Sequence, residues 1–514
     1  MGKIFEVKIN RFDGGVSDDP REPLFNMGSL IKHFDVFSNP FKLIPYRSSE
    51  ADENDGSTAD GMKQYDVRHF TLGSNGKLYG LGKNGSGQPK VVSKAAPGSG
   101  NWTLEATAEG NAARIVGSFI EWQNAFWFFQ GTNQVGKWTI GGTVTNSVGT
   151  VGSTITSVAQ SIVGADNNLY MFYNNQVVRI SPAGGVTDAA VSGLPSDMRI
   201  TSVAPYGSYL AIGMAYGTSA TTAPIGRSKV FLWDMVTTTT LADVVDWGEG
   251  YLRVLGNIEG RICGVSDKYL SSTLGLTRGS MVVRLWAGGV PQVMKEIVAN
   301  QTVTADTSTI TRFPRDVVIK NNKMYWAASV PFGLSTSTES THHLGIWVFG
   351  RKNVNSNFTI SLDYVEEAVD TSNFYINSFG AAGDFWFVNH SADGSIEKTD
   401  DSASYTYTSI YDTQILNGGD SSLNKKMLGV TVFFAALPAA GQVVLKYRIN
   451  EETSYTTIFT HTTDNSLSHS AINIESSGVT LPEFKELVFR IESTGGAEIT
   501  GIRCRYEVID KDIY

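Results

Sequence analysis

The sequence predicts an all-β protein, with a seven-bladed β-propeller followed by a small β-sandwich or jelly-roll domain. Three observations favour this fold class. A small or polar turn followed by an apolar strand recurs seven times along the chain. Turn formers are abundant, with 53 glycines in 514 residues. Long runs with the period of an amphipathic helix are nearly absent. We expect an N-terminal arm with closing strands over residues 1–60, the propeller over 61–415 and the sandwich over 416–514.

The clearest copy of the repeat is a hairpin. Two strand-forming runs, Asn167 to Tyr173 and Gln176 to Ser181, flank Asn174-Asn175, and asparagine tolerates the positive φ that tight hairpin turns need. The seven copies align on one apolar position each, namely Leu78, Phe126, Leu169, Leu210, Ile262, Met324 and Phe385. Their spacings are 48, 43, 41, 52, 62 and 61 residues, and a four-stranded propeller blade typically needs ~40–50. A ring of such sheets buries faces that one sheet alone would expose. The alternative is a plain β-sandwich with chance similarity between strands.

The last 100 or so residues carry a different strand pattern. Strands are expected at Leu428–Phe434, Val443–Arg448, Leu487–Glu492 and Ile499–Ile509. The last of these alternates, with Ile502, Cys504, Tyr506 and Val508 on one face. Period two with one polar face indicates a half-buried antiparallel strand, which favours a small sandwich. Tryptophans at repeating strand positions are expected to pack between sheets; sugar stacking is the alternative.

Composition and charge exclude several function classes. The net charge is −9 and the pI about 5.4, which argues against a basic nucleic-acid groove, so we expect no specific nucleic-acid binding. No apolar run approaches the ~20 residues needed to span a bilayer, so no membrane insertion is expected. The opening residues contain no secretory h-region. Cys263 and Cys504 lie far apart in the sequence and are expected to be buried free thiols.

The sequence offers little for catalysis. His342-His343 is the one close histidine pair, but no carboxylate or cysteine follows at ligand spacing, so neither a metal nor any other cofactor is expected. An acidic stretch from Glu50 through Asp52 to Asp60 does not match the ligand order of an EF-hand and is expected to be a solvated loop. The segment Ser391-Ala392-Asp393-Gly394-Ser395 lacks the spacing of the Asp-box turns of sialidase-like propellers. We therefore predict a protein that is not an enzyme, with a glycosidase-type propeller as the lesser alternative.

Three neighbouring copies of the repeat carry long links between their middle strands. These links are Tyr216–Gly226, Ser266–Gly279 and Pro331–His343, and they fall at the same point of each copy. Loops at equivalent points of a propeller emerge on one face, so a rim rich in serine, threonine and glycine is predicted there. The candidate contact residues are Tyr216, Thr218, Thr222, Arg227, Lys268, Tyr269, Arg278, Phe332, His342 and His343. The alternative is insertion tolerated in exposed loops.

The N-terminal region carries a resemblance. Its segments are Asp13-Gly14-Gly15-Val16-Ser17-Asp18-Asp19-Pro20-Arg21, then His33 to Pro40, then Leu43-Ile44-Pro45-Tyr46-Arg47. They resemble the opening of virion structural proteins that tailed bacteriophages encode with their tail genes. The match covers roughly the first 50 residues. Over the whole chain, the plan is similar to that of tail nozzle and hub proteins of short-tailed phages. The candidate residues of an assembly arm are Asp13, Asp18, Asp19, Arg21 and Arg47.

This resemblance implies a structural role in a virion. The chain would be made in the cytoplasm of the host bacterium and would be located in the phage tail, as a nozzle, hub, tip or fibre-anchoring ring. It would act by oligomeric assembly, and its partners would be other tail proteins and copies of itself. The alternative is a propeller that binds a glycan or receptor on the host surface and mediates attachment, through the predicted rim and the sandwich.

Overall fold

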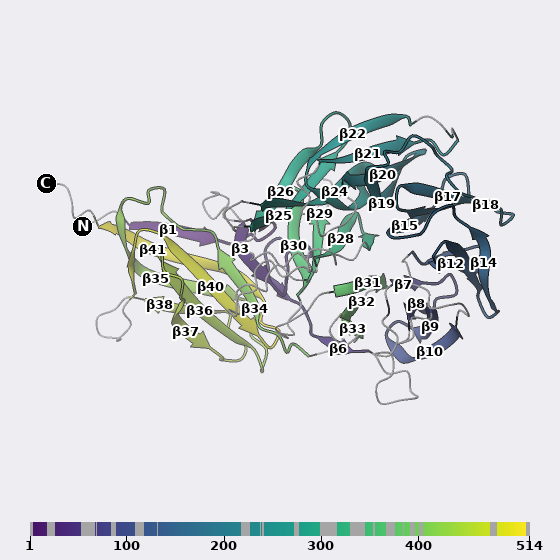
Figure 1. The fold of residues 1–514 in the computed structure, drawn as a ribbon. Coiled ribbons are helices and arrows are strands. Elements are labelled where there is room, and N and C mark those ends of the chain that lie inside the picture. Colours follow the sequence, from purple (N-terminus) through teal and green to yellow (C-terminus); the bar gives the residue numbers. More distant parts are fainter. Residues whose placement is uncertain are drawn as a thin grey trace. The chain divides into compact units, whose positions relative to one another are not determined.

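The computed structural model of the chain is built from β-strands (Figure 1). It describes residues 4–17, 26–52, 67, 69–83, 89–107, 118–130, 132–216, 227–236, 238, 241–271, 277–298, 316–328, 345–352, 355–365, 376–383, 385–390, 396–399, 404–472 and 481–509. None of these residues is helical, so the predicted all-β class is confirmed. Accordingly, this part of the chain has no helix that could cross a membrane. There are two compact units. The first is Met1–Ser48, Trp347–Val365 and Asp401–Tyr514, and the second is Ser49–Ile346 and Glu366–Asp400.

Seven sheets contain four strands each. Sheet 1 holds β7 (His69–Leu72), β8 (Leu78–Lys83), β9 (Pro89–Ala96) and β10 (Ser99–Thr107). Sheet 2 holds β11 (Ile120–Trp122), β12 (Ala125–Gln130), β13 (Gln134–Thr139) and β14 (Val144–Thr150). Sheet 3 holds β15 (Val158–Val163), β16 (Leu169–Tyr173), β17 (Gln176–Ile180) and β18 (Val186–Thr187). Sheet 4 holds β19 (Met198–Tyr206), β20 (Tyr209–Tyr216), β21 (Arg227–Trp233) and β22 (Asp243–Glu249).

The remaining three sheets repeat this plan. Sheet 5 holds β23 (Tyr251–Ile258), β24 (Arg261–Ser271), β25 (Thr277–Trp286) and β26 (Gln292–Val298). Sheet 6 holds β27 (Val317–Lys320), β28 (Lys323–Ala328), β29 (Gly345–Gly350) and β30 (Thr359–Val365). Sheet 7 holds β31 (Ile376–Ala382), β32 (Phe385–His390), β33 (Ile396–Thr399) and, from far upstream, β6 (Ser49–Ala51). All seven alignment residues predicted from the sequence lie in the second strand of a sheet.

The sheets follow one another in a ring. First strands of neighbouring sheets contact each other in four cases, β11 with β15, β15 with β19, β19 with β23 and β23 with β27. Strand β28 of sheet 6 contacts β31, and β31 contacts β7 of sheet 1, which brings the end of the series back to its start. Sheets 1 and 2 share an apolar cluster that includes Tyr79 and Phe126. This arrangement is that of a β-propeller.

The hydrophobic core lies between the sheets. In β16, Leu169, Met171 and Tyr173 pack toward sheet 2, whereas Tyr170 and Phe172 pack toward sheet 4. Both faces of such a strand are buried, which is why the repeat reads as a continuous apolar run rather than as an alternating one. The tryptophans at the repeating positions are buried, as the packing interpretation predicted. They are Trp127, Trp138, Trp233, Trp286, Trp326, Trp347 and Trp386.

Tight turns separate the strands. The β16–β17 turn is Asn174-Asn175, as predicted, and the φ angle of Asn174 is 47°. The Asn174 side chain also ties down the preceding segment, because its Oδ1 accepts hydrogen bonds from the backbone N–H groups of Thr156 and Ser157. At the β27–β28 turn, both Asn321 and Asn322 have positive φ, as a type I′ turn requires.

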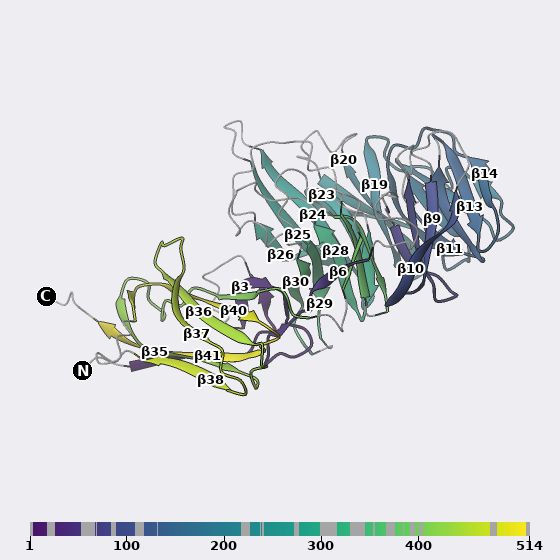
Figure 2. The same ribbon diagram turned by 90° about the horizontal axis from the view of Figure 1, so that it is seen from below.

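Three further sheets belong to the first unit. The five-stranded one contains β1 (Ile4–Ile9), β41 (Ile499–Ile509), β35 (Asn424–Phe434), β38 (Ser468–Ile472) and β39 (Glu483–Phe484). The six-stranded one contains β2 (Gly15–Val16), β3 (Met27–Lys32), β34 (Ser409–Thr413), β40 (Leu487–Thr494), β36 (Gln442–Ile449) and β37 (Thr456–His461). A two-stranded sheet pairs β4 (Phe34–Asp35) with β5 (Ile44–Pro45). Figure 2 shows β36, β37 and β40 in one layer and β35, β38 and β41 in another.

The described N-terminal strands are integrated into these sheets. Strand β1 pairs antiparallel with β41, near the other end of the described chain. Strand β3 pairs with β34, which in turn pairs with β40. The boundary expected at residues 415/416 therefore falls just after a strand that is hydrogen-bonded to the C-terminal sheet. Strand β6 completes sheet 7, so the N-terminal region does contain a closing strand.

Candidate contact surfaces

The predicted rim is formed by the links between second and third strands. In sheets 2 and 3 these links are short, at 131–133 and 174–175. In sheets 4, 5 and 6 they are 217–226, 272–276 and 329–344. Because the sheets repeat one strand order around the ring, links of the same kind leave from the same face. These last three links lie outside the described residues, as do the candidates Thr218, Thr222, Phe332, His342 and His343.

The described rim candidates lie at or near strand ends. Tyr216 is the last residue of β20 and is half-buried. Arg227 begins β21, is exposed, and its Nη2 lies 2.9 Å from Asp246 Oδ2 on the neighbouring strand. An exposed ion pair of this kind contributes only about 0–1 kcal/mol. The backbones of the remaining three candidates, Lys268, Tyr269 and Arg278, are in the β24–β25 ladder.

The link expected over Ser266–Gly279 is largely strand, so that part of the prediction was wrong. The β24–β25 ladder continues without a break to the Ser271–Thr277 pair, leaving only 272–276 as the link. Strands β24 and β25 are 11 and 10 residues long, against five each for β16 and β17. Neither proline nor glycine interrupts Ser266–Ser271, so the antiparallel pairing can propagate. The rim over sheet 5 is therefore a long hairpin.

The described candidates of the N-terminal arm contact their own unit. The Asp13 carboxylate accepts a hydrogen bond from Arg11 Nη2 at 2.6 Å, and the Asp13 carbonyl accepts one from Thr359 Oγ1 at 2.8 Å. Arg47 is exposed, and its guanidinium carbon lies 4.8 Å from the ring centre of Tyr405. Asp13 thus fixes the turn that leads into β2. Asp18, Asp19 and Arg21 lie outside the described residues.

Asp52, expected in a solvated loop, forms a buried ion group instead. Its carboxylate contacts the ammonium group of Lys94 and lies 3.8 Å from that of Lys398. The lysine side chains are only 1% and 8% exposed. Trp102 Nε1 donates to the second carboxylate oxygen at 3.1 Å. Burial raises the pKa of Asp52, although both lysines act in the opposite direction.

The Asp52 group joins the two ends of the ring. Lys94 lies on β9 and Trp102 on β10, both in sheet 1, whereas Lys398 lies on β33 in sheet 7. Asp52 follows the closing strand β6, and its backbone N–H donates to Ile396 O at 2.7 Å. A carboxylate at this point attracts ammonium groups from both sheets. We interpret the group as a lock on the closing strand.

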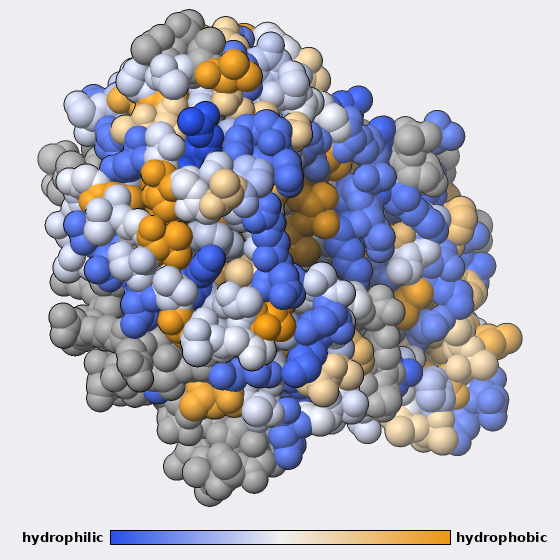
Figure 3. All heavy atoms as spheres, turned by 90° about the vertical axis from the view of Figure 1, so that its right-hand side faces the viewer, coloured by the Kyte–Doolittle hydropathy of each residue, from blue (hydrophilic) through white to orange (hydrophobic). Residues whose placement is uncertain are grey.

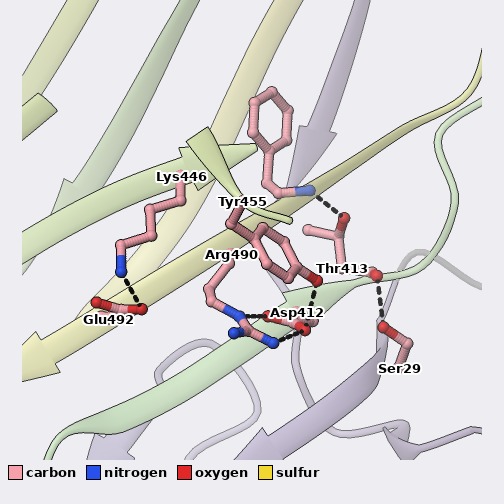
Figure 4. A network of polar contacts seen from close by, with 8 residues as sticks. Ser29, Asp412, Thr413, Lys446, Tyr455, Arg490 and Glu492 are labelled. Carbon is pink, nitrogen blue, oxygen red and sulfur yellow. Dashed lines mark hydrogen bonds and ion pairs between the residues drawn. The ribbon is translucent and has the colours of Figure 1, made fainter. Parts of the chain in front are cut away.

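A second buried network lies in the six-stranded sheet of the first unit (Figure 4). The Asp412 carboxylate on β34 accepts two hydrogen bonds from Arg490 on β40, both at 2.7 Å, and one from the Tyr455 hydroxyl at 2.7 Å. The Arg490 guanidinium carbon also lies 3.9 Å from the ring centre of Tyr455. Both oxygens of Asp412 are engaged within the chain, so the network is a structural cross-link rather than an acid–base pair awaiting a substrate.

Two histidines meet where the edges of the two large sheets come together. His461 on β37 and His469 on β38 stack with ring centres 4.4 Å apart. Phe459 packs against His469 with ring centres 4.5 Å apart, and Ser466 Oγ lies 2.7 Å from His461 Nε2. Burial and the neighbouring His461 lower the pKa of His469. This cluster was not predicted from the sequence, because the two histidines are eight positions apart and on different sheets.

The described residues contain no group of three or more histidine, cysteine, aspartate or glutamate side chains that could hold a metal ion.

The molecular face in Figure 3 is mainly hydrophilic, with hydrophobic residues in small scattered groups. Among the described residues of that face, the hydrophobic side chains do not merge into one large patch.

Comparison with known proteins gives only distant structural likenesses. No protein-family model and no curated protein matches the sequence. A structure of YCF48 bound to a D1 peptide is 12% identical, with a TM-score of 0.42, over 70% of this chain and 97% of that one. BamB from Moraxella catarrhalis is 11% identical, with a TM-score of 0.35, over 77% and 97%. An exo-β-1,3-galactanase from Phanerochaete chrysosporium is 11% identical, with a TM-score of 0.30, over 89% and 99%. Likenesses at this level do not distinguish between functions.

Proposed function

We propose that the chain is a non-enzymatic structural component of a tailed-phage virion and acts in the tail by oligomeric assembly with copies of itself and other tail proteins. In this proposal the seven four-stranded sheets are the blades of one propeller, and the two large sheets of the first unit form a β-sandwich. The propeller serves as a rigid spacer, and the sandwich provides the contacts between subunits. The N-terminal resemblance to phage virion proteins supports the location in a tail.

One structural observation carries the assembly role. The buried charged groups described above are saturated from within the chain: Asp412 by Arg490 and Tyr455, and Asp52 by two lysines. Charged side chains that are paired within the chain cross-link its strands and hold the sheets in a fixed arrangement. A ring or spacer in a tail requires a scaffold that is cross-linked internally in this way, because its contacts with neighbours must keep constant positions.

The proposal is tested in particles and in solution. We expect the chain to co-purify with intact phage particles and to be lost with the tail when tails are removed. We also expect mass photometry of the purified chain, at several concentrations, to show a defined oligomer. A chain that is missing from purified particles would rule out the virion role. A chain that is present in particles but stays monomeric there would rule out the ring assembly.

A second function is favoured by the long β24–β25 hairpin. Its ladder runs six residue pairs beyond Val265–Val283 on the rim side, from Ser266–Val282 to Ser271–Thr277. A long hairpin at the rim suits recognition of a host-surface glycan or receptor. Shortening the hairpin by deleting 269–279 should then abolish adhesion to host cells without changing oligomeric state. Unchanged adhesion would argue against this function, and turnover of a glycan would favour the glycosidase alternative.

A further inference from the structure

The five-stranded sheet has two edges that the described residues leave open. Its strands run in the order β1-β41-β35-β38, with β39 beside β35, and each neighbouring pair is antiparallel. Within the described part of the chain, β1 pairs only with β41 and β38 only with β35. Exposed edge strands usually carry charged side chains or proline that prevent further pairing. Strand β38, with the sequence Ser-His-Ser-Ala-Ile, has no proline and no permanently charged side chain.

The hydrogen-bond pattern shows which β38 residues face the open edge. The backbone N–H of Phe434 donates to the carbonyl of Leu467 at 3.0 Å, one position beyond the Phe433–Ser468 pair. That pair is therefore a non-hydrogen-bonded one. Because the pattern alternates, the N–H and C=O groups of His469 and Ala471 point toward β35. The same groups of three other residues point to the open edge, namely Ser468, Ser470 and Ile472.

The same alternation continues across the sheet to β1. Ala471 pairs with Val430, so Val430 bonds toward β38, and its partner on the other side, Cys504, bonds toward β1. Cys504 pairs with Val7, which therefore bonds toward β41. Three residues of β1 direct their backbone groups to the open edge: the two that flank Val7 and the first residue of the strand. These are Glu6, Lys8 and Ile4.

The side chains at the two edges alternate in the same phase. Along β1 the exposed residues are Ile4, Glu6 and Lys8, and along β38 they are Ser468, Ser470 and Ile472. The side chains of the other residues of both strands lie on the buried face of the sheet. Val7, Cys504, Val430 and Ala471 lie opposite one another across the four strands, so they share one face, and Cys504 and Val430 are buried. Edge-facing backbone groups and outward side chains thus coincide on both strands.

We infer that β1 of one copy of the chain pairs antiparallel with β38 of the next copy. This inference rests on the proposed assembly function and names the surface that would carry it. The register that pairs every residue of β38 places Ile4 opposite Ile472, Glu6 opposite Ser470 and Lys8 opposite Ser468. All three are pairs in which both residues direct backbone groups to the shared edge, so the new ladder continues the alternation of the sheet. The strand directions also alternate correctly across the junction.

Side-chain complementarity favours this head-to-tail pairing. Ile4 is 59% and Ile472 44% exposed, and the two would cover each other on the outer face. Pairing β1 with β1 about a two-fold axis in the central register would instead place Glu6 opposite Glu6, and like charges directly opposite are destabilising. A head-to-tail contact uses two different surfaces of each copy and can close into a ring.

Cysteine cross-linking tests the predicted register. Directly opposite hydrogen-bonded residues have Cα atoms ~5.5 Å apart, within the range of a disulfide. We expect a mixture of Ile4→Cys and Ile472→Cys chains to form a disulfide-linked heterodimer under mild oxidation. The matched control is Ile4→Cys with Ser468→Cys, because Ser468 lies four residues away along β38, or roughly 13 Å, and should not link. The native thiols are buried, so the parent chain is expected to give no cross-link.

A backbone variant tests the edge without new cysteines. Ser470→Pro removes an N–H that faces the open edge and no N–H that bonds to β35, and proline is tolerated on edge strands. It also removes the Ser470 hydroxyl, which lies 2.9 Å from Thr431 Oγ1 on β35, so Ser470→Ala is the control for that contact. We expect Ser470→Pro to shift the oligomer to monomer with a melting temperature close to that of the parent. Ala471→Pro is the contrasting variant, because it removes an N–H that bonds to Val430 and should lower the melting temperature.

The outcomes separate this inference from the proposed function. An oligomer in particles without any Ile4–Ile472 cross-link would overturn the edge pairing and leave the assembly role intact. Dimers formed by Ser470→Cys alone would show a two-fold β38–β38 contact and would also overturn it. A chain absent from particles that still cross-links between Ile4 and Ile472 would support the edge pairing and refute the tail role.

Discussion

Arg490 holds the Asp412 carboxylate through two parallel contacts, Nε to Oδ1 and Nη2 to Oδ2, each 2.7 Å long. The side chains are 12% and 5% exposed, so the pair is almost fully removed from water. The Tyr455 hydroxyl donates a third hydrogen bond to the same carboxylate. The pair joins two neighbouring strands, β34 and β40. Strand β34 lies before residue 416, where the C-terminal domain was expected to begin.

Removing the Asp412 charge should destabilise the first unit strongly. In Asp412→Asn the Arg490 guanidinium loses the carboxylate that it contacts through two nitrogens, and breaking a buried pair in this way costs about 3–5 kcal/mol. Urea unfolding followed by circular dichroism measures the loss. The matched control is Glu498→Gln, which breaks the more exposed pair with Lys42 and should cost only about 0–1 kcal/mol. Equal, small losses in both variants would contradict the structural role assigned to Asp412.

The Asp52 lock gives a corresponding prediction for the second unit. Asp52→Asn removes the buried carboxylate charge beside Lys94 and Lys398, so we expect a loss of about 3–5 kcal/mol. Because Asp52 follows β6, amide exchange should also rise at Ser49–Ala51, where the closing strand pairs with β33. Hydrogen-exchange mass spectrometry locates that effect. Asp246→Asn, which breaks the exposed pair with Arg227, should change neither readout appreciably. Full protection of β6 in Asp52→Asn would disprove the lock.

The repeat and its strand alternation could be predicted because they are local. A strand buried on both faces needs a run of apolar residues, and all seven alignment residues lie in such second strands. The Asp52 group could not be predicted in the same way. Its acidic neighbours indicate a solvated loop, and Lys94 is 42 positions away in the sequence. Only the closure of the ring brings the two side chains together.

The pairing of strands that are far apart in the sequence could not be predicted from a local sequence pattern either. Strand β1 alternates as expected for a half-buried strand, but nothing in residues 4–9 indicates that their partner is β41. That region was expected to be an N-terminal arm with closing strands. The candidate rim shows the opposite kind of error. Turn-forming residues around Ser266–Gly279 indicated a loop, but pairing between β24 and β25 extends the hairpin through most of that segment.

The histidine cluster predicts that stability depends on pH. The pKa of His469 is lowered in the folded chain, whereas an unfolded histidine titrates near ~6.5. As the pH falls through 6.5 the unfolded state therefore binds the proton first, and stability decreases until the pH passes below the folded pKa. We expect the melting temperature of the parent to drop between pH 7.5 and 5 by more than that of His469→Gln.

The dependence of melting temperature on pH is compared between the parent and His469→Gln, and this comparison isolates His469 from other titrating groups. Both proteins carry the same carboxylates, so their shared pH dependence cancels in the difference. Ser466→Ala, which keeps both imidazoles but removes the hydroxyl near His461, is the matched control and should retain the parent slope. A His469→Gln chain whose melting temperature falls as steeply as that of the parent would show that the lowered pKa does not contribute.

The two cysteines, predicted and found to be buried free thiols, should be inert in the folded protein. Burial raises the pKa of Cys504 to about 12 and also raises that of Cys263, so both remain protonated at pH 8. The thiolate is the reactive form. With a thiol reagent such as 5,5′-dithiobis-(2-nitrobenzoic acid) at pH 8, we expect almost no reaction in buffer and two equivalents in denaturant.

The same reaction can report the two units separately, because Cys504 belongs to the first unit and Cys263 to the second. In Cys263→Ser the remaining thiol follows opening of the five-stranded sheet, and in Cys504→Ser it follows opening of sheet 5. Asp412→Asn should accelerate labelling of Cys504 but leave that of Cys263 unchanged, since the lost ion pair lies in the first unit. Asp52→Asn should have the opposite effect. Equal acceleration of both thiols by either variant would show that the two units unfold as one.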